Sequence, residues 1–162
     1  LAALDATIAT TGDGGGPGIA AADFFEGMMA TALGDHDIVT AVEVPAAPTE
    51  QGQAYVKFAH PASRYAVVGV AAAVTVTGGT ISTAAVALGG LVPTATRAAS
   101  VEQALAGQTP SADVIAAAAA AVTADLGDDL IGDIYASAEY RRAMAPVCVK
   151  RALTAAVERA SS

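Results

Sequence analysis

Two tyrosines, a phenylalanine, a lysine and an arginine lie within one short stretch of the chain, residues 54–69 (AYVKFAHPASRYAVVG). A strand lysine such as Lys57 is ordinarily a solvated edge residue, but its ammonium can also donate a hydrogen bond to a carbonyl of a conjugated ring. Tyr65 either packs in the core with its hydroxyl at the surface or stacks on a planar ligand. The stretch therefore predicts either an ordinary sheet surface or a contact surface for a planar ligand.

Other reactive residues are sparse. Cys148 is the single cysteine, which excludes a disulfide framework and any cysteine-based zinc site or iron–sulfur cluster within this chain. We expect Cys148 to be a small core residue. The glycine-rich segment 11–18 (TGDGGGPG) lacks the Lys-Ser/Thr ending of a phosphate loop, so a flexible turn is favoured. A stand-alone hydrolase would need a base beside its nucleophile, and only His36 and His60 could supply one.

Composition sets further limits. The chain has 162 residues, of which 43 are Ala, 16 are Gly and only 4% are aromatic, so any core must be built from small side chains. A net charge of −8 argues against general nucleic-acid binding. The most apolar run, residues 65–76, is too short to cross a bilayer. Residues 1–50 hold eight acids and no Lys or Arg, whereas five of the eight bases lie in 141–159. These regions are either solvated faces or surfaces that meet each other or a partner.

The first fifty residues predict a small mixed unit. A strand is expected over 1–10, a loop over 11–18 and a helix over 21–32 with Asp23 as its N-cap. Alternation over 37–44 (DIVTAVEV) predicts another strand. The proline- and alanine-rich stretch 45–52 is the best candidate for a domain boundary.

The remainder predicts three strands followed by three helices. A strand is expected over 54–59, and the strongest hairpin signal joins 66–77 to 80–88 through Gly78-Gly79, because glycines supply the positive φ angles of a tight turn. Helices are expected over the three ranges 100–106, 111–126 and 137–160.

Ser100 is the expected N-cap of the first helix, and Pro146 should kink the third or mark its first turn. The residues expected on its apolar face are Met144, Val147, Val149, Leu153 and Val157. The fold class is therefore α+β, a three-stranded antiparallel sheet packed on three helices.

An ordered set of segments resembles a known family. The segments are ADFF at 22–25 with Gly27 and TAL at 31–33; DIVTAVEVP at 37–45; YVK at 55–57, RYA at 64–66 and VAA at 70–72; VALGG at 86–90 with Pro93-Thr94, Arg97-Ala98, Glu102, Leu105 and Gly107; and Asp133, Tyr140-Arg141 and RAL at 151–153. Together they resemble the C-terminal half of the FAD-binding subunit of molybdenum hydroxylases, the family of the carbon monoxide dehydrogenase medium subunit and the flavin domain of xanthine dehydrogenase.

The resemblance implies a role in electron transfer. In such enzymes the substrate is oxidised in a molybdopterin-binding large subunit, and electrons pass through two [2Fe-2S] clusters of a small subunit to FAD and then to an external acceptor. The implied assembly is a cytoplasmic hetero-oligomer with no nucleic acid and no membrane span. The cofactor supplies the redox chemistry, and the protein holds and tunes it.

The resemblance also implies three flavin contacts. Val39 would contact the flavin through its main chain, and Lys57 would hydrogen-bond the isoalloxazine, which favours negative charge on the reduced ring. Tyr65 occupies the position at which the carbon monoxide enzymes place an aromatic side chain near the ring, where many relatives carry an acid. Arg64 is a nearby candidate for charge balance.

The two glycine-rich loops with which the family holds the FAD pyrophosphate, "AGGHS"-like and "TIGG"-like, do not occur in this sequence. The resemblance thus implies that residues 1–48 are the end of the α+β FAD-binding domain and that 53–162 form the complete C-terminal domain. We expect this chain alone to hold FAD weakly or not at all. The alternative is a non-catalytic α+β module that only docks larger subunits.

Overall fold

The computed structural model describes residues 1–12 and 18–160. In chain order the elements are the 3₁₀ helix η1 (Ala2–Leu4), β1 (Thr7–Thr11), β2 (Ile19–Ala20), α1 (Ala21–Phe24), β3 (Phe25–Gly27), β4 (Ala30–Thr31), β5 (Ile38–Glu43), β6 (Gln51–Ala59), β7 (Ala66–Thr77), β8 (Thr80–Gly89), β9 (Thr96–Arg97), α2 (Ala99–Leu105), α3 (Ala112–Ala121), the 3₁₀ helix η2 (Val122–Ala124) and α4 (Ala138–Ala160). The mixed α+β class is confirmed, and most of the predicted loop 11–18 lies outside the described residues.

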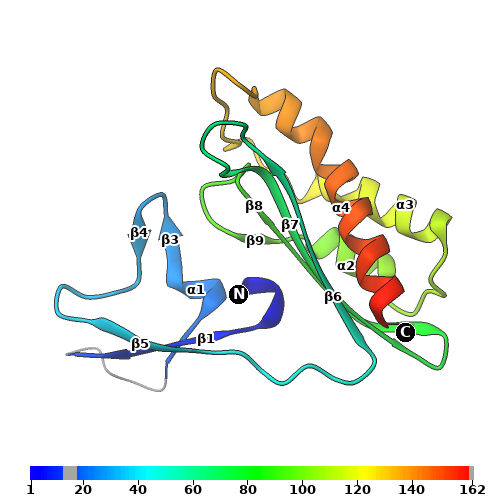
Figure 1. The fold of residues 1–162 in the computed structure, drawn as a ribbon, viewed down its shortest axis with the longest axis horizontal. Coiled ribbons are helices and arrows are strands. Elements are labelled where there is room, and N and C mark those ends of the chain that lie inside the picture. The colour runs from blue at the N-terminus through cyan, green and yellow to red at the C-terminus, as the bar shows by residue number, and fades with distance from the viewer. Residues whose placement is uncertain (13–17, 161–162) are drawn as a thin grey trace.

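The larger layer is an antiparallel sheet of order β6-β7-β8-β9 (Figure 1). The β7–β8 hairpin is confirmed at the predicted place, since Gly78 and Gly79 have φ angles of 60° and 79°. The sheet has one strand more than predicted. This two-residue strand, β9, pairs with β8 at Ala87 and Leu88 and follows a proline-containing connection that carries no strand pattern.

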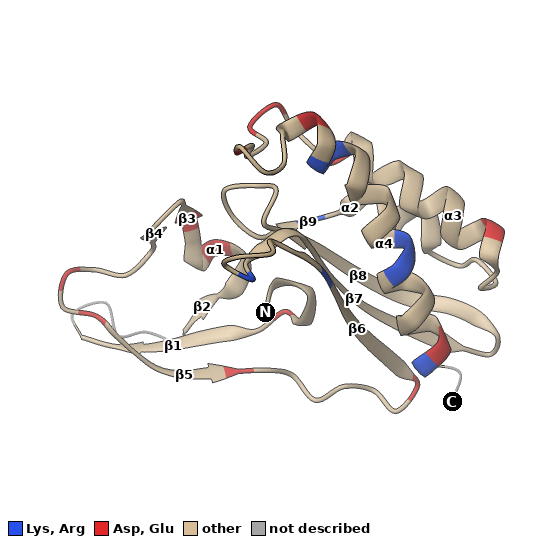
Figure 2. Ribbon diagram, turned by 45° about the horizontal axis from the view of Figure 1, so that its top comes forward, with Lys and Arg blue, Asp and Glu red and all other residues tan. Residues whose placement is uncertain are grey.

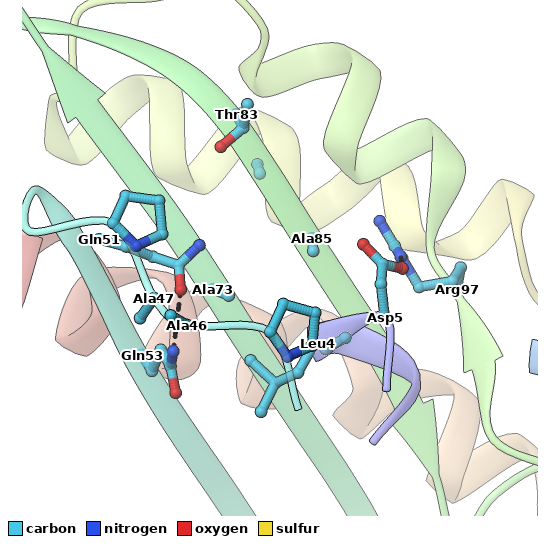
Figure 3. A pocket seen from close by; sticks show the side chains of 14 residues that line it. Leu4, Asp5, Ala46, Ala47, Gln51, Gln53, Ala73, Thr83, Ala85 and Arg97 are labelled. Atoms are coloured by element: carbon cyan, nitrogen blue, oxygen red, sulfur yellow. Dashed lines mark hydrogen bonds and ion pairs between the residues drawn. The ribbon is translucent and has the colours of Figure 1, made fainter. Parts of the chain in front are cut away.

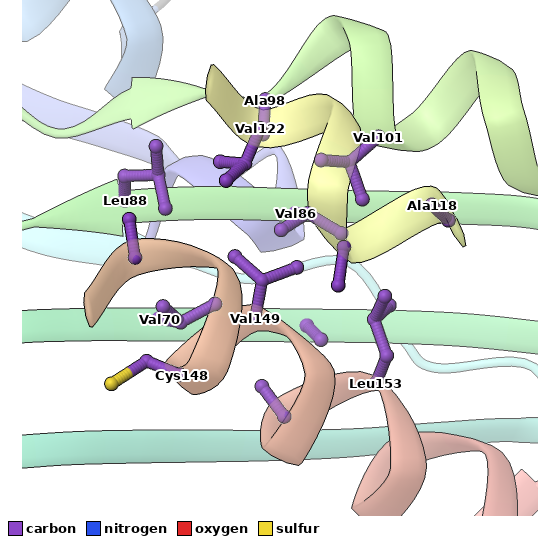
Figure 4. Packing of buried hydrophobic residues seen from close by; sticks show 14 of the residues in the cluster. Val70, Val86, Leu88, Ala98, Val101, Ala118, Val122, Cys148, Val149 and Leu153 are labelled. Carbon is purple, nitrogen blue, oxygen red and sulfur yellow. The ribbon is translucent and has the colours of Figure 1, made fainter. Parts of the chain in front are cut away.

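Helices α2, α3 and α4 cover one face of this sheet and enclose the main core (Figures 1 and 4). Valines of β7 point to the helices, whereas their neighbours on the other face are Gly69, Ala71 and Ala73. The side of α4 against the sheet is rich in small residues, which lets helix and sheet approach closely. Its buried residues are Arg141, Ala145, Cys148, Val149, Ala152, Leu153 and Ala156.

Details of the helices differ from expectation. Helix α4 continues through Pro146, which lies well beyond its first turn. Val147 was wrongly expected in the core and is 39% exposed, because the small residues of α4 take the positions against the sheet. The predicted Ser100 cap of α2 is also wrong, since the Ser100 N–H donates instead to the Asp125 carboxylate at 3.0 Å. Ser111 caps α3, since its Oγ accepts the Val114 N–H at 3.2 Å, but α3 ends at Ala121 and continues only as η2.

The first fifty residues form two small sheets, β2-β1-β5 and β3-β4, beside the open face of the large sheet (Figure 1). The strand at 37–44 is confirmed as β5, and β1 is confirmed although η1 replaces its first residues. The helix expected over 21–32 is wrong. Only α1 is helical, Asp23 lies inside it rather than capping it, and β3 and β4 follow. Beyond α1, Met28 and Met29 are 65% and 101% exposed, so no core is present to bury a helix face.

No described helix is long and apolar enough to cross a membrane. Figure 2 shows acidic residues scattered over the β1–β5 part, while basic residues are concentrated along α4. One ion pair, Arg97 with Asp5 at 2.9 Å, links the first fifty residues to the large sheet.

Candidate functional site

Strand alternation separates the side chains that are close in sequence between 54 and 69. In β6, Val56 and Phe58 face the helices, whereas Tyr55 and Lys57 face the opposite, open side of the sheet. Phe58 packs near the rings of Tyr135 and Tyr140, at centroid distances of 6.4 and 6.1 Å. It therefore belongs to the helix side, and the open face keeps one lysine and one tyrosine of this strand.

Lys57 lies opposite two glycines. Its cross-strand partner in β7 is Gly69, and the partner of Gly69 in β8 is Gly89. A Cβ at Gly89 would meet no atom within 4 Å. Lys57 is exposed, and its ammonium makes no hydrogen bond or ion pair with the described part of the chain. The arrangement is a strip of two glycines, Gly69 and Gly89, with one unpaired cation at its end.

Tyr55 borders this strip and was not singled out as a contact residue from the sequence. A Cβ at Gly69 would lie only 2.7 Å from the Tyr55 hydroxyl, so the phenol reaches over Gly69. Tyr55 is 62% exposed. The period-2 spacing of Tyr55 and Lys57 is the signal that could have found it, because residues i and i+2 of a strand share a face.

Tyr65 and Arg64 lie in the loop between β6 and β7, at the same end of the sheet as Lys57. Tyr65 is 80% exposed, so its predicted placement as a core ring is wrong and the alternative of an accessible ring remains. The loop is held by its own backbone. The His60 N–H donates to the Tyr65 main-chain oxygen at 2.8 Å, and Arg64 adopts a left-handed φ of 60°.

A groove of about 280 Å³ adjoins this end of the sheet. Its walls come from strand β3 on one side and from the end of β8 with the following loop on the other. The lining residues are Phe25, Gly27, Gly89, Gly90, Val92, Pro93, Thr94 and Ala95. An aromatic ring from the first fifty residues thus faces the glycine end of the large sheet.

Val39 lies elsewhere in the fold. It belongs to β5, pairs with Thr10 of β1 and is 40% exposed. Among the described strands, β5 pairs only with β1. The structure therefore brings Lys57 and Tyr65 to one end of one sheet and does not bring Val39 into that group.

A buried arginine supports the glycine end of the sheet from the helix side. Arg141 is 4% exposed, and its Nη1 donates to the main-chain oxygens of Gly90 at 2.7 Å and Val67 at 3.3 Å. Its Nη2 pairs with Asp133. N–H bonds from Ala136 and Tyr135, with the nearby Arg141, hold the pKa of Asp133 below its ordinary value.

A second cavity, of about 290 Å³, lies between η1, the linker 45–48 and the open face of the sheet (Figure 3). The charged side chains at this cavity already form ion pairs with protein groups. Arg97 pairs with Asp5 and, at 2.6 Å, with Glu102, and hydrogen bonding to Glu102 raises the pKa of Arg97. Glu102 also accepts the Val86 N–H at 2.8 Å. This cavity is therefore an internal junction rather than an open ligand site.

His60, one of the two candidate general bases, is already engaged within its own turn. His60 Nδ1 accepts the N–H groups of Ala62 and Ser63 at 3.2 and 3.3 Å, so that nitrogen organises its own turn. Within residues 1–12 and 18–160, no group of three or more His, Cys, Asp or Glu could hold a metal ion. Cys148 is buried in the core as expected, and burial raises the pKa of its thiol.

The sequence profile of the CO dehydrogenase flavoprotein C-terminal domain matches residues 53–156. The carbon monoxide dehydrogenase medium chain of Afipia carboxidovorans is 33% identical over 98% of this chain and 54% of its own length. The glyceraldehyde dehydrogenase medium chain of Sulfolobus acidocaldarius is 30% identical over 94% of this chain and 53% of its own. The chain thus spans about half the length of these curated relatives.

Solved structures agree in fold. A carbon monoxide dehydrogenase from Hydrogenophaga pseudoflava superposes with a TM-score of 0.89 at 34% identity, covering 98% of this chain and 54% of that one. Quinoline 2-oxidoreductase from Pseudomonas putida 86 gives a TM-score of 0.86 at 27% identity, covering 99% and 55%. From the match over 53–156 and the agreement in fold, the chain belongs to the CO dehydrogenase flavoprotein C-terminal domain family.

Proposed function

We propose that this chain is part of the FAD-binding medium subunit of a molybdenum hydroxylase of the carbon monoxide dehydrogenase type. In this role the subunit passes electrons from [2Fe-2S] clusters through FAD to an external acceptor. The observation that carries the proposal is the unpaired Lys57 ammonium beside the glycine strip of Gly69 and Gly89. When bound, FAD supplies the hydride and single-electron chemistry.

The residues present fit the ring of such a cofactor. A planar ring needs a surface with few side chains. Gly89 faces open space, the Tyr55 phenol lies over the neighbouring Gly69, and Phe25 lines the adjoining groove. A carbonyl of the ring needs a donor, and Lys57 has no competing partner among the described residues. Lys57 would bind and orient the ring edge and favour negative charge there. Tyr65 and the Val39 main chain remain proposed contacts.

The division of the chain is part of the same proposal. Residues 1–48 would be the end of the FAD-binding domain and 53–162 the C-terminal domain. The pyrophosphate loops of the family are absent from the sequence, so the chain alone should hold FAD weakly or not at all. Titration with FAD followed by flavin fluorescence tests this point, and tight stoichiometric binding would contradict it.

The proposed partners are a molybdopterin-binding large subunit and a [2Fe-2S] small subunit in a cytoplasmic hetero-oligomer. The chain's own composition is compatible with clusters in a partner, because one buried cysteine cannot supply the four ligands of a cluster. Co-purification of the three subunits with stoichiometric iron, molybdenum and FAD tests the assembly.

The decisive experiment uses the only two lysines of the chain. In the full flavoprotein subunit, Lys57→Ala should shift the flavin absorbance and reduction potential or lower FAD content, because the ring loses its charged donor. Lys150→Ala is the matched control, since Lys150 is also exposed but lies on α4, across the sheet from the strip. If Lys57→Ala leaves spectrum, potential and FAD content unchanged, the subunit-docking alternative is favoured.

A further inference from the structure

Arg141 is a buried cation whose hydrogen bonds converge on the two strand ends next to the glycine strip. Its Nη1 binds the Gly90 oxygen, which follows β8, and the Val67 oxygen, which is the second residue of β7. Its Nε donates to the Ala136 oxygen at 3.2 Å, and its Nη2 pairs with Asp133. One side chain of α4 thus joins the ends of β7 and β8 to the loop that precedes the helix.

The two strand ends are tightly packed where Arg141 binds them. Gly90 has a left-handed φ of 83°, and a Cβ there would lie 2.3 Å from the Ala66 oxygen. Ala66 directly follows Tyr65, and Gly90 directly follows Gly89. Movement of either strand end would therefore move both the Tyr65 loop and the glycine strip relative to Lys57.

Burying an arginine at this position carries a desolvation cost that an apolar residue would not have. Buried ion pairs can be replaced by well-packed apolar residues at little or no loss of stability, because desolvation offsets their attraction. What an apolar residue cannot do is hold three main-chain oxygens at fixed positions with one planar fork. The geometry favours a role in alignment over a role in stability.

We propose that Arg141, held by Asp133, is a positioning residue that fixes the ends of β7 and β8 and thereby aligns the Tyr65 loop and Gly89 with Lys57. The inference rests on the proposed function for its effect on the flavin. The hydrogen bonds of Arg141 end at Val67, Gly90, Ala136 and Asp133, none of which belongs to the strip, and Arg141 projects from α4 on the helix side of the sheet.

The test substitutes each of two adjacent arginines by lysine. Arg141→Lys keeps the charge but cannot reach three oxygens at once. Arg142→Lys is the matched control, because Arg142 also binds main-chain oxygens, those of Leu126 at 3.2 Å and Gly127 at 2.7 Å, but none at the glycine end. The first readout is amide hydrogen exchange of the 162-residue chain. The second is the FAD dissociation constant and flavin absorbance of the full subunit.

For Arg141→Lys we expect exchange at residues 66–69 and 89–91 to rise roughly tenfold while the rest of β7 and β8 keeps its protection. In the full subunit we expect FAD to bind roughly tenfold more weakly, with a changed flavin spectrum. Arg142→Lys should do neither. If Arg141→Lys fails to fold, Asp133→Asn serves instead, since its amide oxygen can still accept the Tyr135 and Ala136 N–H groups but has no charge to hold Arg141.

The Lys57→Ala result distinguishes a failure of the positioning role from a failure of the proposed function. If Lys57→Ala perturbs the flavin but Arg141→Lys and Asp133→Asn do not, the proposed function stands and the positioning role is refuted. If Lys57→Ala has no effect on the flavin either, both proposals fall together. Uniformly faster exchange over the whole sheet would also overturn the inference, because it would show a contribution to global stability alone.

Discussion

Gly52 offers a sharp test of how closely α4 packs on the sheet. A Cβ at this position would lie 1.9 Å from the Ala156 oxygen and 2.4 Å from the Ala160 nitrogen, both backbone atoms of α4. Nearby, Arg159 donates to the Gln53 main-chain oxygen, which ties the helix end to β6. A methyl group at residue 52 therefore has no flexible side chain to displace.

The destabilisation expected for Gly52→Ala follows from these distances. Ordinary van der Waals contact begins at 3.4 Å, so α4 would have to withdraw by 3.4 − 1.9 = 1.5 Å. Leu153 and Ala156, both 0% exposed, would lose contact with the sheet. Overpacking of this kind costs about 3 kcal/mol when the neighbour is backbone. For a chain of this size that loss lowers the thermal midpoint by about 6–12 °C.

The assay is urea and thermal unfolding of the 162-residue chain, followed by far-UV circular dichroism. Gly89→Ala is the matched control, because Gly89 also lies in a strand, has no positive φ and faces open space. We expect that variant to be neutral or stabilised by about 0.5 kcal/mol. A Gly52→Ala protein within ~0.5 kcal/mol of the wild type would refute the close packing of α4 on β6.

Three further predictions concern charged and nucleophilic groups. Arg97→Ala should lower the free energy of unfolding by about 1 kcal/mol, because Glu102 and Asp5 lose their ion-pair partner and partial exposure limits the loss. Urea unfolding measures this change, and an unchanged midpoint would contradict it. Cys148 should react with a disulfide reagent roughly 100-fold more slowly in the native than in the urea-unfolded chain, since it is buried. Burial also raises its thiol pKa, despite the opposing effect of Arg151, so the native state is favoured below pH 9.0 and that contribution is lost as pH rises through the native pKa. The pKa of Asp133 is lowered, so the ionised carboxylate stabilises the native state above about pH 3.8, and this stabilisation is lost as pH falls through the native pKa. The difference in unfolding free energy between wild type and Asp133→Asn should therefore shrink between pH 6 and pH 3. A difference that stays constant would exclude this linkage.

Elements with strong local signals were predictable. The Gly78-Gly79 turn and the alternating β6 both depend on residues within a few positions of one another, and the structure confirms each. The α+β class followed from their order along the chain. The family was also within reach of the sequence, because its segments recur in the same order.

Elements that depend on distant partners were not predictable. The helix expected over 21–32 fails because no described residue buries Met28 and Met29. The Ser100 cap fails because α2 begins at Ala99, so Ser100 lies inside the helix and its N–H donates to Asp125, 25 residues away. In α4 small residues share the buried side with large ones, since Ala145 and Ala152 lie against the sheet while Val147 is 39% exposed. These outcomes depend on packing geometry that a local pattern does not contain.

The candidate site shows the same division. The sequence by itself determined that Lys57 and Tyr55 share a strand face and that glycines occur at positions 69, 89 and 90, because residue type and strand period are local properties. Only the tertiary structure decided that Gly69 and Gly89 lie side by side across from Lys57, since strand register brings together residues far apart in the chain. It also decided that Arg141 is buried behind them, because three oxygens from separate segments converge there to satisfy one guanidinium.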